Sequence, residues 1–114
     1  MRRIAAALIP LILVFALASV GRAEEPAKTD AASLDKGKGV YSAQHCSMCH
    51  AIAGKGNPKT PLDDVGAKLK PEEIRKYIVS PKDVKADSKM RGYPGLPAAD
   101  LDALVAYLSS LKKK

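Results

Sequence analysis

Residues 46–50 read Cys-Ser-Met-Cys-His, and this short motif constrains the chain more than any other stretch. Two thiols separated by two residues can each add to one vinyl group of a haem, and the histidine that follows can place its imidazole under the iron. The spacing therefore predicts one covalently attached haem. Cys46 and Cys49 would form the thioether bonds, and His50 would be the proximal iron ligand.

A C-x-x-C pair also occurs in redox dithiols, in zinc sites and in small-loop disulfides. A thioredoxin-like dithiol requires a βαβ setting, and no strand alternates with a helix in this sequence. A structural zinc site needs four ligands, and outside the motif the chain offers only His45, whose adjacency to Cys46 makes tetrahedral ligation awkward. The chain has only two cysteines, so no other disulfide framework competes for them. We therefore favour haem attachment.

Residues 1–23 have the features of a secretory signal peptide. Two arginines precede an apolar run over residues 4–20, and small residues on either side of Arg22 offer a cleavage site after Ala23. The alternative is a retained membrane anchor, although a run of 17 residues is short for a bilayer span and Pro10 interrupts it. In either case we expect the globular part to lie outside the cytoplasm, in the periplasm.

The 91 residues that would remain after cleavage contain few large apolar side chains. They include eight Leu, three Ile and five Val, and neither Phe nor Trp. A domain of this size often needs a staple, a metal or another added core. A tethered haem would supply a large apolar body for these side chains to pack against, so the composition is a second indication of a cofactor.

The charge of the remaining chain is mildly basic. It holds 16 basic and 12 acidic residues, which gives a net charge of +4. The lysines are scattered and no aromatic residues alternate with them, which argues against nucleic acid as a partner. A basic surface does favour encounter with an acidic partner protein.

Three helices are predicted after a flexible lead-in over residues 24–32. The first runs from about Leu34 to Gln44, with Ser33 as its cap and two glycines inside it. The second begins at Lys70-Pro71, where proline and two glutamates suit a helix start, and stops before Pro81. Its apolar residues recur at helical spacing: Ile74, Tyr77 and Ile78.

The third helix lies near the C-terminus, and Pro97 suits its first turn. Its apolar residues form a stripe at helical spacing: Leu101, Leu104, Val105, Leu108 and Leu111, with Tyr107 beside it. Residues 51–61 and 81–97 are rich in Gly, Pro or charged residues and are predicted to be loops.

The chain resembles the class I, single-haem c-type cytochromes over most of residues 33–112. The resemblance rests on these residues: Gly37, Tyr41, Cys46, Cys49, His50, Pro61, Leu62, Met90, Leu104, Tyr107 and Leu108. It implies a small all-α cytochrome c fold over residues 33–114, with three to four helices packed around the haem. In this family a glycine and an aromatic residue of the first helix meet a leucine and an aromatic residue of the last helix.

Two details of the resemblance leave alternatives open. Tyr41 lies five residues before Cys46 where the family usually has four, so Gly37, Gly39 or Val40 could stand at the helix crossing. The resemblance also implies that the backbone carbonyl of Pro61 faces the second ring nitrogen of His50, although Pro61 could equally serve only to shape the turn.

Met90 is the candidate for the sixth iron ligand. Met1 would leave with the signal peptide, and Met48 lies between the two tethered cysteines, where it cannot reach the opposite haem face. Met90 is the remaining thioether, 40 residues after His50 and in a loop, and the family also places its methionine ligand just before the last helix. The spacing of Tyr77 favours a core residue; it could in addition reach a haem propionate, although nothing in the sequence requires this.

These features predict a monomeric periplasmic protein that carries one electron at a time and is not an enzyme. Lys55, Lys59 and Lys89 are the candidate contacts for acidic redox partners. One alternative is a fixed haem-bearing subunit of a larger oxidoreductase. Another is an enzyme or sensor with an open sixth iron position, which would require Met90 to be free.

Overall fold

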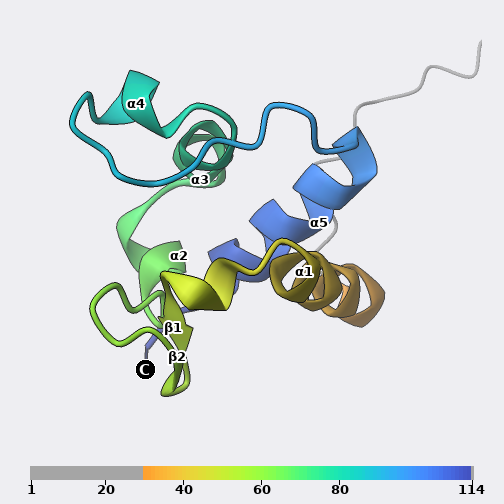
Figure 1. The fold of residues 1–114 in the computed structure, drawn as a ribbon. Helices are drawn as coiled ribbons and strands as arrows, with labels where there is room; N and C mark the ends of the chain where they lie inside the picture. The colour runs from red at the N-terminus through yellow and green to blue at the C-terminus, as the bar shows by residue number, and fades with distance from the viewer. Residues whose placement is uncertain (1–29, 114) are drawn as a thin grey trace, which may run out of the picture.

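The computed structural model describes residues 30–113, so the expected signal peptide and residues 24–29 lie outside the described residues. Figure 1 shows a mostly helical chain. Its elements in order are α1 (Ala31–Ala43), the 3-10 turn η1 (Cys46–Met48), β1 (Ala51–Ile52), β2 (Lys55–Gly56), α2 (Val65–Lys68), α3 (Pro71–Val79), α4 (Pro81–Val84) and α5 (Ala98–Ser109). The predicted all-α fold is confirmed, with three longer helices and two single-turn helices. No helix between residues 30 and 113 combines the length and apolar character that a membrane span needs.

The first helix begins earlier than its sequence indicates. Asp30 is the N-cap of α1, and its Oδ1 accepts a hydrogen bond of 2.8 Å from the N–H of Ser33. An aspartate at this position satisfies one of the free N–H groups of the first turn and therefore competes well with Ser33 as a cap. The prediction that the lead-in extends to Ala32 was wrong for its last two residues, which are helical.

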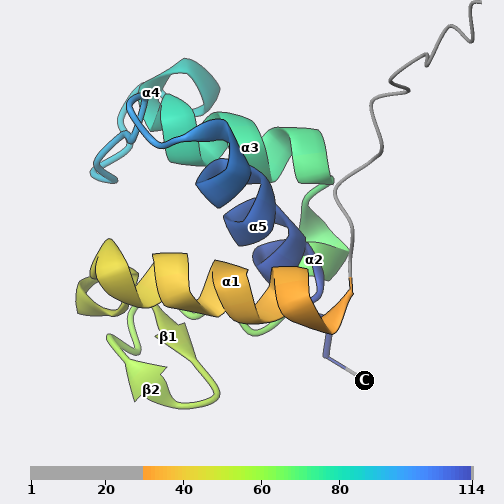
Figure 2. The same cartoon turned by 90° about the vertical axis from the view of Figure 1, so that its right-hand side faces the viewer.

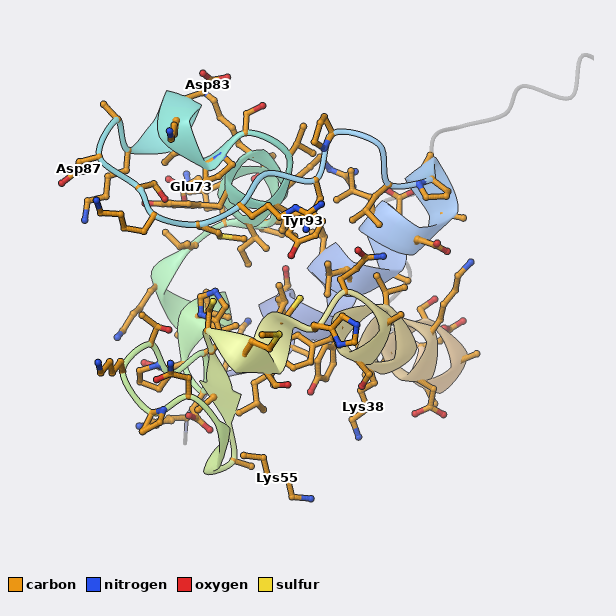
Figure 3. The ribbon with its side chains drawn as sticks, in the orientation of Figure 1. Lys38, Lys55, Glu73, Asp83, Asp87 and Tyr93 are labelled. Carbon is orange, nitrogen blue, oxygen red and sulfur yellow. The ribbon has the colours of Figure 1, made fainter. Side chains whose placement is uncertain are left out.

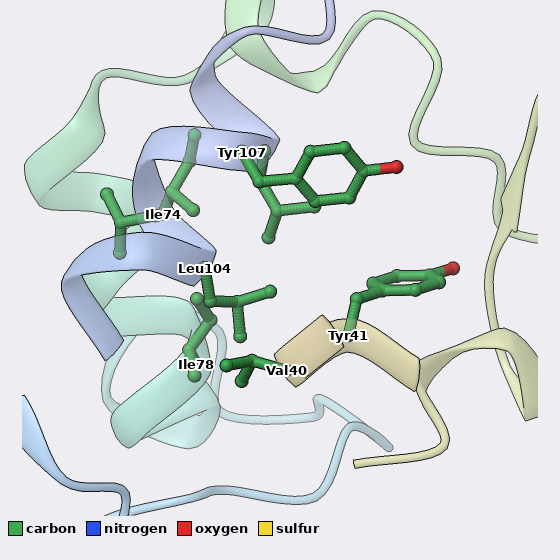
Figure 4. Packing of buried hydrophobic residues seen from close by; sticks show 8 residues of the cluster. Val40, Tyr41, Ile74, Ile78, Leu104 and Tyr107 are labelled. Atoms are coloured by element: carbon green, nitrogen blue, oxygen red, sulfur yellow. The ribbon is translucent and has the colours of Figure 1, made fainter. Parts of the chain in front are cut away.

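The first and last helices cross at Gly37. A Cβ at Gly37 would overlap the carbonyl oxygen of Ala103 on α5, whereas a Cβ at Gly39 would meet nothing within 4 Å. Close to the crossing, the rings of Tyr41 and Tyr107 meet edge to face, with centroids 6.1 Å apart and an angle of 71° between the ring planes (Figure 4). The choice left open by the sequence is therefore resolved in favour of Gly37, because only there does the partner backbone leave no room for a side chain.

The core lies where α5 packs between α1 and α3 (Figure 2). Ile74 and Ile78 of α3 are buried against this helix, as their spacing predicts, while Tyr77 is only half-buried. The buried part of α5 extends without a break from Ala103 to Leu108. The helix ends at Ser109, so Leu111 lies beyond it, and the Leu111 carbonyl accepts the N–H of Gly66 in α2 at 2.9 Å.

Two segments predicted as loops contain short regular elements. β1 and β2 form an antiparallel hairpin that pairs Ala51 with Gly56, and Pro81–Val84 form the single turn α4. Such short pieces carry no periodicity that a sequence pattern could reveal. The hairpin directly follows the Cys-x-x-Cys-His turn, and α4 directly precedes the loop that contains Met90.

Candidate haem site

The motif cysteines lie on η1, at the point where the chain leaves α1. His45 adopts the left-handed conformation, with φ of 56°, and turns the backbone from α1 into η1. Cys46 is half-buried and packs against the core, Cys49 is exposed, and both thiols are free. Burial raises the pKa of the Cys46 thiol above its ordinary value. Both sulfurs required for two thioether bonds are thus carried by one short turn.

His50 is held in a defined orientation by the backbone of Thr60. Its Nδ1 lies 3.1 Å from the carbonyl oxygen of Thr60. A carbonyl can only accept, so Nδ1 is the donor of this bond; in the neutral ring the lone pair then lies on Nε2, which is the form that ligates a metal. The resemblance implied the Pro61 carbonyl at this place, and the structure has the carbonyl of the preceding residue, Thr60, instead.

Pro61 shapes the neighbouring backbone. Its segment forms a parallel bridge with Ala51, in which the Ala51 N–H donates to the Thr60 carbonyl at 3.3 Å and the Leu62 N–H donates to the Ala51 carbonyl at 2.8 Å. Because proline has no N–H and fixes its own φ, it suits a position between these two bonds. The alternative in which Pro61 only shapes the turn agrees with the structure.

Met90 lies in the loop between α4 and α5, as predicted, with a half-buried side chain and its N–H 3.2 Å from the hydroxyl of Ser88. Met48 is 74% exposed. Tyr77 is half-buried, and no hydrogen bond ties its hydroxyl to another part of residues 30–113. The assignments of Met90 and Tyr77 to the haem remain predictions.

Tyr93 is an anchor of the Met90 loop that the sequence analysis missed. Its N–H donates to the Ile78 carbonyl at 2.8 Å, and its hydroxyl donates to the carbonyl of Gln44 at 3.4 Å. Figure 3 shows the Tyr93 ring pointing from this loop towards α1 and α5. Gln44 is two residues before Cys46, so Tyr93 connects the methionine loop to the start of η1. An aromatic residue in a loop rich in Gly, Pro and charge was the available signal.

The residues of the turn fit a covalently attached haem with a histidine ligand. The turn supplies two free thiols and an imidazole in the ligating tautomer. In addition, the Tyr41 hydroxyl is buried without a hydrogen-bond partner among the described residues. Such orphaned groups are rare in native interiors, and this one lies close enough to Cys46 to interact with it electrostatically. Within residues 30–113 no three His, Cys, Asp or Glu side chains gather in a way that could hold a bare metal ion.

The comparisons with known proteins agree with this geometry. Residues 34–112 match the family described as Cytochrome c. The chain is also similar to the cytochrome c oxidase subunit 2 of Alkalihalophilus pseudofirmus, with 32% identity over 98 residues. That match covers 78% of the chain but only 28% of the longer relative. Because the family match includes the turn, the His50 segment, the Met90 loop and both crossing helices, this chain belongs to the cytochrome c family, whose covalently bound haem c transfers electrons through its iron.

Proposed function

We propose that this protein is an exported one-electron carrier whose single haem c is attached to Cys46 and Cys49 and ligated by His50 and Met90. The observation that carries the proposal is the contact of 3.1 Å between His50 Nδ1 and the Thr60 carbonyl. It leaves Nε2 as the free ring nitrogen of a histidine placed directly after two free thiols. Neither a redox dithiol nor a disulfide needs an imidazole held in this tautomer.

Each residue of the proposed site has a separate task. Haem c, when bound, supplies an iron that gains or loses one electron. Cys46 and Cys49 keep the group in place through thioether bonds, and the Thr60 carbonyl fixes the imidazole plane and increases its basicity. The Met90 thioether, as a soft ligand, would stabilise the reduced iron and raise the reduction potential. With both axial positions filled by the chain, no position remains for a substrate, so the protein would not act as an enzyme.

The location and the partner are part of the same proposal. Residues 1–23 would direct export to the periplasm and then be removed, leaving a short lead-in and the cytochrome c domain that begins with α1. Lys55, Lys59 and Lys89 are exposed, and Lys55 extends from the hairpin into solvent (Figure 3). Positive charge in these loops would steer encounter with acidic redox proteins, an effect that salt screens.

Optical spectra of the haem-loaded protein test the ligand set. A weak near-infrared sulfur-to-iron band in the oxidised state, and no spectral change with carbon monoxide in the reduced state, are expected. Met90→Ala should abolish the band, allow carbon monoxide to bind and lower the reduction potential. Met48→Ala, which removes the exposed thioether, should change none of these. Carbon monoxide binding by the unsubstituted protein would instead support an enzyme or sensor.

A second candidate function is favoured by the similarity to an oxidase subunit. In that case the chain would be a fixed haem-bearing subunit through which electrons enter a larger complex. N-terminal sequencing and fractionation of the haem-loaded protein separate the two. A chain that begins near Glu24, is released with the periplasm and elutes as a monomer supports the carrier. A chain that keeps residues 1–23 and elutes with other subunits supports the second candidate.

A further inference from the structure

The hairpin that follows His50 folds back against the haem-binding turn. Gly56 has a φ of +109°, and a Cβ at this position would overlap the carbonyl oxygen of His50 and lie 3.0 Å from that of Ser47. Only glycine combines this backbone conformation with so close an approach. The hairpin therefore brings the next residue, Asn57, directly against the turn.

Asn57 uses both its backbone and its side chain to bind the turn. Its N–H lies 3.1 Å from each of the carbonyl oxygens of Ser47 and His50, and its Nδ2 donates to the Met48 carbonyl at 3.3 Å. Its Oδ1 accepts the N–H of Lys59 at 3.0 Å, which fixes the side chain in this orientation. One residue thus holds three carbonyls of the motif.

Thr60 holds the remaining end of the turn. Its hydroxyl donates to the carbonyl of Cys49, and its own carbonyl accepts from His50 Nδ1. The Cys46 carbonyl is bonded within the turn, by the N–H groups of Cys49 and His50. All five carbonyls of residues 46–50 therefore have a donor, and Asn57 and Thr60 bind the four that the turn itself does not satisfy.

These bonds are not needed to protect buried groups. Ser47, Met48 and Cys49 are exposed, so water could bond their carbonyls at little cost. Bonds to water, however, would not hold these peptide units in one conformation. The bonds from Asn57 and Thr60 restrict the backbone between the two cysteines and the histidine, and restricting a backbone has a free-energy cost that must be offset by specific contacts.

We propose that Asn57 and Thr60 are positioning residues that set the orientation of the His50 imidazole and thereby tune the haem iron. The proposal rests on the proposed function, because it requires His50 to be the proximal ligand. A strong bond from Nδ1 to a fixed carbonyl makes the imidazole a better electron donor and favours the oxidised iron. If the Thr60 peptide becomes mobile, this bond weakens and the balance moves towards the reduced iron.

Two substitutions that add no charge, Thr60→Val and Thr60→Ser, test the proposal in the haem-loaded protein. Valine keeps the shape and removes the hydroxyl that binds Cys49, whereas serine keeps the hydroxyl. In Thr60→Val the ratio of reduced to oxidised protein, measured against a fixed mediator potential, should rise by about 2- to 10-fold, the range expected for one hydrogen bond. Exchange of the His50 Nδ1 proton with solvent, followed by NMR, should accelerate by a similar factor. Both quantities should stay within about twofold of the original in Thr60→Ser.

Asn57→Ala provides an independent test and should shift both readouts in the same direction. Ser47→Ala is the matched control, because it removes a hydroxyl from the turn itself without touching any of these bonds. The sulfur-to-iron band should persist in every variant, since the changes are on the histidine side. If the unsubstituted protein lacks that band, the proposed ligand set fails. If the band is present and neither Thr60→Val nor Asn57→Ala moves the potential or the proton exchange, the positioning role is overturned.

Discussion

The turn that carries His50 and the loop that carries Met90 are held in place very differently. Every carbonyl of residues 46–50 accepts a hydrogen bond, and the hairpin packs against the turn. In the loop of residues 85–97, the N–H of Met90 bonds only the nearby Ser88 hydroxyl. The loop is tied to the rest of the fold by the two hydrogen bonds of Tyr93, by the packing of Leu96 against the core and by the close approach of Gly92 to the Val79 carbonyl. The histidine side is therefore built as a fixed support. The methionine side depends on a few anchors, so we expect it to yield first when the protein is stressed.

A pair of glycine substitutions tests this difference and should give the largest effect. Gly56→Ala forces a side chain into a positive φ and against the His50 carbonyl, and should lower the free energy of unfolding by about 3 kcal/mol. Gly95→Ala, in the methionine loop, adds a methyl group where nothing lies within 4 Å and should change stability by no more than about 0.5 kcal/mol. Denaturant unfolding of the haem-loaded variants measures both. Equal effects would contradict the close approach of Gly56 to the His50 carbonyl, which has no counterpart at Gly95.

Tyr41, at the crossing of α1 and α5, makes the free energy of unfolding depend on pH. Burial, and then the nearby Cys46, raises the pKa of its hydroxyl to about 12, from an ordinary value of 10.0. As the pH rises, the hydroxyl therefore loses its proton at a lower pH in the unfolded chain than in the folded protein. The stabilisation that the protonated hydroxyl gives the folded protein is fully present below pH 10 and is lost as the pH rises towards 12.

Tyr41→Phe isolates that contribution. Between pH 9 and pH 12 the original protein should lose about 2–3 kcal/mol more stability than the variant, the amount that corresponds to the shift. At pH 7 the two should differ by about 1 kcal/mol or less, since the hydroxyl has no partner among the described residues. Denaturant unfolding across this pH range gives both numbers. Parallel pH profiles for the two proteins would contradict the assignment to Tyr41.

The methionine loop should respond to the loss of its hydroxyl anchor. Tyr93→Phe keeps the ring and removes the bond to the Gln44 carbonyl, and should cost about 1 kcal/mol. The sulfur-to-iron band should then disappear at lower denaturant concentration than in the original protein, with the histidine side unaffected. Tyr107→Phe is the control, because the Tyr107 hydroxyl forms no hydrogen bond in the described part of the chain and the residue lies outside the methionine loop. A change of the same size in both variants would show that the Tyr93 hydroxyl does not anchor the loop.

The sequence points more readily to the residues that would carry chemistry than to those that would position them. Cys46, Cys49 and His50 are recognisable because covalent attachment requires fixed spacing, and the apolar stripe of α5 follows from helical period. Thr60 and Asn57 act largely through backbone geometry, which depends on how the hairpin closes. No residue type or spacing encodes that closure, so the sequence does not single out the Thr60 carbonyl as the partner of His50.

The cap of the first helix and the glycine at the helix crossing could not be chosen from the sequence for a similar reason. Asp30 and Ser33 are both good N-caps, and the choice between them depends on a single side-chain hydrogen bond. Gly37 and Gly39 are equivalent in propensity, and only the position of Ala103 on the partner helix distinguishes them. Local preference thus predicted the three longer helices, whereas the contacts between elements determined which of two suitable residues has the role.

Arg91 provides the smallest test of how loosely the methionine loop is held. Its guanidinium carbon lies 5.7 Å from the centroid of the Tyr93 ring, beside Met90 in sequence. Arg91 is exposed, and a cation–π contact at an exposed site contributes about 0.5–1 kcal/mol. Arg91→Gln should therefore lower stability by about 0.5 kcal/mol in the original protein and by less in Tyr93→Leu, where no ring remains. Thermal unfolding of the four proteins in this double-mutant cycle measures the coupling, and effects that add within about 0.3 kcal/mol would show that Arg91 does not act through Tyr93. Coupling at this level would mean that Arg91 helps to hold the Tyr93 ring, and through it one of the anchors that connect the methionine loop with the rest of the protein.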